Sequence, residues 1–99
     1  NIGTAATAIY TSTGNNVVSL IYFCNISGST KTVILYLVPA AQSSGGAQTY
    51  NQIYNNYSIT ASDTLVVNQE KFVLSNGDAL YANANAAAAF TATIGYFAL

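Results

Sequence analysis

The chain has 99 residues, of which only five are charged, and its net charge at pH 7 is −1. This length corresponds to one domain that can bury a single hydrophobic core. With no Arg, no His, two Lys and one Cys, the composition excludes the basic surface that binds nucleic acid and the ligand sets of most zinc and transition-metal sites.

The first half of the chain has the pattern of three strands separated by turns. Residues 6–12 predict the first strand, and the Gly and Asn residues at 13–16 predict a turn, because both types tolerate a positive φ. Strands are then expected at 17–25 and 32–38, which are β-branched, aromatic and apolar on both faces. This pattern, apolar on both faces, favours a strand in the middle of a sandwich. Pro39 ends the third strand because it has no N–H to donate to a neighbouring strand.

The second half continues in the same way after a loop at 40–47 and a Tyr-rich segment at 49–60. Four further strands are expected at 64–67, 72–74, 79–84 and 90–96. The Ala-rich connection 85–89 is too short to form a stable helix between two strands. About eight strands at this spacing predict an all-β fold: a single antiparallel β-sandwich, similar to a jelly roll, over residues 1–99.

The first seven residues are small or apolar and uncharged. We interpret residues 1–7 as a candidate extended arm that could reach a neighbouring subunit, with a frayed terminus as the alternative. The longest apolar run, 33–41, is less than half of the roughly 20 residues that a transmembrane helix needs. We therefore expect no membrane insertion, and the near-neutral surface favours self-association.

The carboxylates do not suggest catalysis. Asp63 and Asp78 lie in turn sequences, where Asp accepts hydrogen bonds from its own backbone, and Glu70 stands beside Lys71 in a polar segment. No His is present to activate Cys24, which we interpret as a small buried apolar residue. We expect a protein that is not an enzyme and that holds no cofactor and no metal.

The Tyr-rich segment is the strongest candidate for a binding surface, because Tyr covers apolar area and also offers a hydroxyl group. The candidate partner interface consists of Tyr50, Asn51, Tyr54, Asn55, Asn56 and Tyr57. Two alternatives stay open: the rings pack over the core, or they stack on sugar rings. On an unbroken strand Tyr57 would face away from the other two rings, whereas a bulge at Asn55 and Asn56 would bring all three to one face.

Several structural motifs follow one another along the chain. The strand sequence Ile21-Tyr22-Phe23-Cys24-Asn25 precedes a small-residue turn, and Val33–Pro39 forms the next strand. A Leu-x-x-Gly-Asp-x-Leu-Tyr motif at 74–81 then precedes the Ala-rich connection and the alternating strand Phe90–Tyr96. This order resembles that of small all-β virion proteins of tailed bacteriophages.

The resemblance implies a structural component of the virion, assembled in the host cytoplasm, with no catalytic activity. Its most specific form is a capsid decoration (cement) protein, which binds the lattice of the major capsid protein and stabilises the head. The alternatives are a neck, tail or fibre module of the same virion, or a carbohydrate-binding module for attachment to the host. The expected partners are the major capsid protein, other virion proteins or further copies of this chain.

Overall fold

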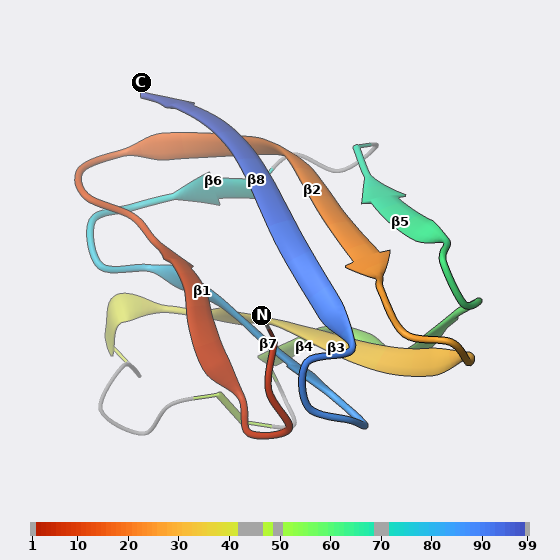
Figure 1. The fold of residues 1–99 in the computed structure, drawn as a ribbon. Coiled ribbons are helices and arrows are strands. Elements are labelled where there is room, and N and C mark those ends of the chain that lie inside the picture. The colour runs from red at the N-terminus through yellow and green to blue at the C-terminus, as the bar shows by residue number, and fades with distance from the viewer. Residues whose placement is uncertain (1, 42–46, 49–50, 69–71, 99) are drawn as a thin grey trace.

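The computed structural model describes residues 2–41, 47–48, 51–68 and 72–98 (Figure 1). These residues form eight strands in two antiparallel sheets and no α-helix, which confirms the predicted all-β sandwich. The strands are β1 (Thr7–Thr11), β2 (Asn16–Asn25), β3 (Lys31–Val38), β4 (Gln52–Ile59), β5 (Thr64–Val67), β6 (Phe72–Leu74), β7 (Ala79–Ala84) and β8 (Phe90–Ala98). The connection 85–89 is a tight turn, as its length predicts.

The two sheets differ in their strand order. The first, the β3 sheet, has the order β1-β7-β3-β4. In the second, the β2 sheet, β2 is central and pairs along its whole length with β8. The opposite side of β2 is divided between β6, which pairs with Asn16–Val18, and β5, which pairs with Ile21–Cys24. Two short strands therefore form one interrupted edge.

The chain crosses repeatedly between the sheets. It passes from β1 to β2 and back to β3, stays in the β3 sheet for β4, enters the β2 sheet for β5 and β6, and then alternates again through β7 and β8. Such crossings are the connections of Greek-key sandwiches, the group to which jelly rolls belong. They bring residues distant in the sequence into one core.

The core lies between the two sheets and is built from alternate residues of the strands. Ile21 and Phe23 of β2 belong to the same core cluster as Val33 and Leu35 of β3. Phe90, at the start of β8, belongs to it as well, and all five side chains are fully buried. Complete burial of a large apolar side chain stabilises the fold by about 1.5–3 kcal/mol. This core fixes which side of each strand faces outward.

The segment interpreted as an arm lies against the domain. Ile2 is buried in the core cluster, and its N–H donates to the carbonyl of Phe90 at 3.0 Å. The carbonyl of Gly3 accepts from the N–H of Ala84 at 2.9 Å, and Thr7 begins β1. Residues 2–7 thus join the start of β8 to the end of β7 rather than extending away from the sandwich.

One buried polar residue organises the end of β2. Asn25 is fully buried, and its Nδ2 donates to the carbonyls of Ser29 and Ile59 at 3.0 and 2.8 Å. Its Oδ1 accepts from the N–H and the hydroxyl of Ser27 at 2.9 and 2.7 Å. With both polar atoms satisfied, this amide fixes the β2–β3 turn and ties it to the end of β4.

Candidate interaction surface

The Tyr-rich segment forms β4, at the edge of the β3 sheet, and its backbone is irregular. Tyr57 lies opposite Val33 and Tyr54 lies opposite Leu35, so β4 has one more residue than β3 over this stretch. The φ of Asn56 is 50°, in the left-handed region that Asn tolerates better than most residues. The bulge considered from the sequence at Asn55 and Asn56 is therefore present.

The bulge brings two of the three Tyr rings together. The ring centroids of Tyr54 and Tyr57 are 5.7 Å apart, and the planes meet at 76°, an edge-to-face contact. Residues opposite each other in a sheet share a face, and their partners Val33 and Leu35 are fully buried. Both rings therefore lie on the core side of the edge strand, where Tyr54 packs against the core and Tyr57 stays 43% exposed.

The other members of the candidate interface have different environments. Tyr50 lies outside the described residues. Asn51 lies just before β4 and is tied to Gln48: its Oδ1 accepts from the N–H of Gln48 at 3.0 Å, and its own N–H donates to the Gln48 carbonyl at 2.9 Å. Asn55 and Asn56 are exposed at the bulge. Of the alternatives drawn from the sequence, packing describes Tyr54 best, while Tyr57, Asn55 and Asn56 remain accessible.

A small hollow lies beside Tyr57, between the end of β4 and the start of β5. It has a volume of about 140 Å³ and is lined by Tyr57, Ser58, Ile59, Thr60, Asp63, Thr64 and Leu65. Ligand pockets usually have volumes of about 300–1,000 Å³. The Asp63 carboxylate accepts from the N–H of Thr64 at 2.8 Å, so it already serves the turn. The hollow itself is smaller than a usual ligand pocket.

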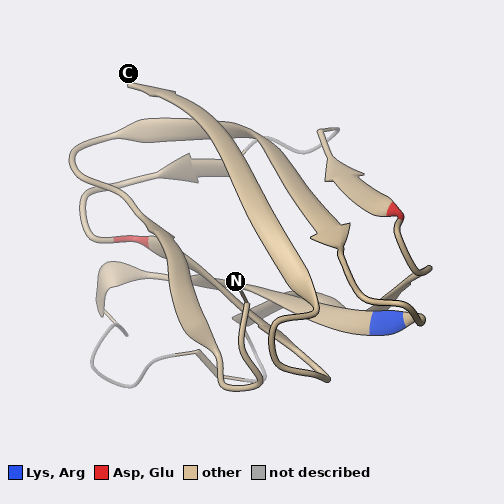
Figure 2. Ribbon diagram, viewed as in Figure 1, with Lys and Arg blue, Asp and Glu red and all other residues tan. Residues whose placement is uncertain are grey.

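The described carboxylates belong to turns, as their sequence setting predicts. Asp78 accepts from the N–H of Ala40 at 2.9 Å and from the N–H of Ser75 at 3.0 Å. Asp63 and Asp78 lie at opposite sides of the sandwich (Figure 2), so they do not face each other across a site. Glu70 and Lys71 lie outside the described residues. In the described part of the chain, no three His, Cys, Asp or Glu side chains are grouped so that they could hold a metal ion. The same residues contain no helix that is long and apolar enough to cross a membrane.

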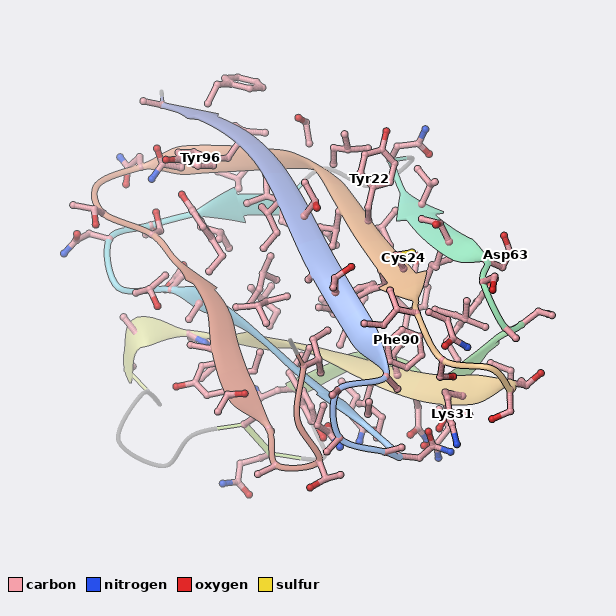
Figure 3. The ribbon with its side chains drawn as sticks, in the orientation of Figure 1. Tyr22, Cys24, Lys31, Asp63, Phe90 and Tyr96 are labelled. Carbon is pink, nitrogen blue, oxygen red and sulfur yellow. The ribbon has the colours of Figure 1, made fainter. Side chains whose placement is uncertain are left out.

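The outward side of the β2 sheet is a second candidate surface, and it is apolar. Tyr22 lies opposite Val66, and Val17 lies between Val73 and Phe97, so these side chains share the face that points away from the core. Figure 3 shows Tyr22 on the side of β2 away from the other sheet. We call this surface the β2 face; its apolar residues are Val17, Leu20, Tyr22, Val66, Val73 and Phe97.

The β2 face carries no charged residue, and four of its six apolar residues are exposed, whereas Val17 is buried and Leu20 is half-buried. Val73 is 66% exposed, Phe97 53%, Val66 42% and Tyr22 37%. Thr64, Thr91 and Thr93 add hydroxyl groups to the same face, because they lie opposite Cys24 and Tyr22. The charged residues that the structure describes are Lys31 in β3 and the turn residues Asp63 and Asp78, and none of them belongs to β2, β5, β6 or β8 (Figure 2).

The position of Cys24 corrects the interpretation made from the sequence. Cys24 was expected to be buried, but it is only partly buried and lies on the β2 face, opposite Thr64 and Thr91. The strand 17–25 is apolar on both faces, a pattern that favours enclosure between two layers. The same pattern also describes a strand with one face in the core and one face open to a partner, and this signal for the β2 face was missed.

The chain matches no protein-family model, and no curated protein or solved structure is significantly similar to it. The resemblance to phage virion proteins therefore rests on the quoted sequence motifs alone.

Proposed function

We propose that the protein is a non-catalytic structural subunit that is held in a larger protein assembly through its β2 face. The observation that carries this proposal is the exposed, uncharged apolar surface around Val73 and Phe97. Monomeric soluble proteins rarely expose contiguous apolar patches of more than a few hundred Å², and larger patches mark interaction sites. The β2 face spans four strands, which makes protein contact its most economical explanation.

The composition of the face also fits a protein partner. The centres of protein–protein interfaces are depleted in charged residues and enriched in aromatic residues. The β2 face offers Tyr22 and Phe97 among aliphatic side chains, with Thr64, Thr91 and Thr93 as neutral hydrogen-bonding groups. An apolar surface with neutral hydroxyls suits burial against another folded protein better than contact with a solvated polymer.

The specific form of the proposal is a bacteriophage capsid decoration protein that binds the major capsid protein lattice. Its support is the resemblance of the sequence motifs to phage virion proteins, together with a face suited to permanent burial. A neck, tail or fibre module would use the same face in fewer copies per particle. The carbohydrate-binding alternative would use Tyr57 and the adjoining hollow instead, and so predicts a different set of sensitive residues.

The test is attachment of the isolated protein to phage particles assembled without it. Val73→Lys places a charge on the β2 face, and the matched control Ser58→Lys places the same charge on an exposed position of β4. We expect both variants to melt like the wild type, because both positions are exposed. Only Val73→Lys should lose co-sedimentation with the particles, and attachment should slow the labelling of Cys24.

Electron microscopy of the decorated particles then distinguishes the forms of the proposal. Density distributed over the head supports a decoration protein, whereas density confined to the neck, tail or fibres replaces that form with the alternative. Equal attachment of the two Lys variants, or equal labelling of Cys24 in free and attached protein, would contradict the use of the β2 face. Loss of attachment in Tyr57→Ala alone would favour glycan binding.

A further inference from the structure

The strand β8 has one free side. On its other side, β8 pairs with β2 from the Asn25–Phe90 pair to the Asn16–Ala98 pair. The register shifts once, between Val18 and Leu20, where β2 has one extra residue. The bulge is therefore in β2, and β8 itself is regular. The carbonyl of Phe90 accepts from Ile2 and therefore points away from β2. The carbonyl of Ala89 accepts from Ile26, the residue after β2, which confirms the alternation of backbone groups.

This alternation identifies the unpaired backbone groups. In a regular strand, successive residues direct their N–H and C=O groups to opposite sides. The groups of Ala92, Ile94 and Tyr96 therefore point to the same side as the Phe90 carbonyl. Beyond the bridge to Ile2, no strand in the described part of the chain pairs with β8 on that side.

We propose that this free side of β8 pairs antiparallel with β8 of a second copy of the chain, which joins the two β2 sheets into one. Ile2 occupies the edge at Phe90, so pairing with a second copy can begin at Thr91. The paired stretch is then 91–97, seven residues with Ile94 at the centre. The two-fold axis then passes between the Ile94 residues of the two copies. Thr93 of each copy lies opposite Gly95 of the other.

A second copy suits this edge because identical strands meet there without electrostatic conflict. A symmetric dimer places the same surface of each subunit in contact, so any charge on the strand would lie near its own copy. Like charges opposite each other destabilise a strand pair, and Phe90–Ala98 contains none. β8 also lacks the Pro, Lys and bulges with which sheet edges are commonly protected.

The pairing would also extend the surface that carries the proposed function. Thr91, Thr93 and Phe97 lie on the β2 face, so the β2 faces of the two copies would become continuous across the axis. Stable interfaces bury about 1,200–2,000 Å² in total, more than two short strand edges cover. We therefore expect weak dimerisation in dilute solution. At a high local concentration, as in an assembly, most of the protein should be dimeric.

The first experiment measures self-association of the isolated protein by sedimentation velocity over a wide concentration range. The variant Thr93→Lys adds a charge at an exposed position near the axis, and Ser58→Lys is the matched control. We expect wild type and Ser58→Lys to dimerise with the same midpoint, and Thr93→Lys to weaken the dimer at least tenfold. A wild type that stays monomeric into the millimolar range, or a Thr93→Lys variant that dimerises like the control, would overturn the proposal.

A second experiment fixes the strand and the register. Thr93→Cys and Gly95→Cys proteins, each also carrying Cys24→Ala, are mixed and oxidised gently. Opposite residues without mutual hydrogen bonds have Cα atoms about 4.5 Å apart, within the range that disulfides span. The mixture should cross-link faster than either protein alone, and a Ser58→Cys mixture should not; equal rates in all samples would refute the register.

This inference rests on the proposed function only in treating the chain as an assembly subunit. Both experiments use the isolated protein, whereas the proposed function is tested by attachment to particles. Val73 lies on β6, away from the free side of β8, so Val73→Lys changes the β2 face without changing the dimer contact. Thr93 lies on the β2 face as well as near the axis, so Thr93→Lys is used only to measure dimerisation of the isolated protein. Val73→Lys should dimerise normally, so failure of either proposal can be recognised separately.

Discussion

The edge strands β4 and β8 have similar lengths and neither carries a charge, but they leave very different edges. β4 has two irregularities in its pairing with β3, one between Tyr57 and Tyr54 and one between Tyr54 and Gln52. β8 is regular, and its outward backbone groups from Ala92 to Tyr96 are evenly spaced. Because the two strands differ in backbone geometry rather than in charge, we expect β8, but not β4, to accept another strand.

The physical reason is that a bulge disrupts the hydrogen-bonding alternation on both sides of a strand. An incoming strand next to β4 would meet donors and acceptors out of step at Asn55 and Asn56, and the local twist would turn the edge away. The same bulge places the rings of Tyr54 and Tyr57 over the open side of the core. One local irregularity therefore both protects the β4 edge and completes the packing.

The largest expected effect tests what anchors β8. Phe90 is fully buried, whereas Phe97 on the same strand is 53% exposed on the β2 face. Phe90→Ala should lower the free energy of unfolding by about 3–5 kcal/mol through loss of burial and cavity formation. Phe97→Ala, the matched control, should stay within the roughly 0.5 kcal/mol typical of surface substitutions. Urea unfolding measures both, and similar losses would contradict the outward orientation of Phe97.

The next effect tests the corresponding anchor on β4. Tyr54 packs against the core, so Tyr54→Ala should lower the free energy of unfolding by about 1–3 kcal/mol. Tyr57→Ala should remove mainly the edge-to-face contact, which is worth about 0.5–1.5 kcal/mol. Thermal unfolding and attachment to particles are measured on both variants. Unchanged melting of Tyr54→Ala with loss of attachment would restore the Tyr-rich strand as the partner interface.

A smaller effect isolates the bulge that makes the two edges different. Asn56 has a φ of 50°, where a β-branched residue is strained. Asn56→Val should therefore cost about 1–2 kcal/mol, the usual penalty for an L-residue in the left-handed region. Asn56→Gly is the control and should be close to neutral, because Gly adopts this conformation freely. Equal stability of the two variants in urea would mean that the left-handed residue contributes nothing to the edge.

Several strand bounds and the bulge in β4 could be predicted from the sequence alone. The strands at 64–67, 72–74 and 79–84 were predicted with the bounds that the structure has, because turn residues flank each of them. Tolerance of Asn for irregular dihedrals was enough to locate the bulge as one of two alternatives. These are local properties, fixed by a few neighbouring residues.

The surfaces depend on long-range pairing, and the sequence pattern does not specify it. Alternation identifies which residues of 17–25 share a face, but not whether another layer covers that face; Cys24 was placed in the core for this reason. Nothing local indicates that β5 and β6 form one interrupted edge, or that Ile2 joins Phe90. The exposed β2 face and the free side of β8 follow from those pairings.

The smallest expected effect is the response of attachment to salt. Ion pairs are screened over about 8–10 Å at physiological ionic strength, whereas apolar burial is not weakened by NaCl. The described charged residues Lys31, Asp63 and Asp78 lie outside the strands that form the β2 face, so attachment through that face should survive molar NaCl. Co-sedimentation with particles at low and at molar NaCl measures this directly. Val73→Lys is measured in the same assay. If burying its new charge weakens attachment through loss of hydration, its attachment should be weak at both salt concentrations. Release of the wild type by salt alone would show that ionic groups carry the contact, and the β2 face would then be the wrong surface.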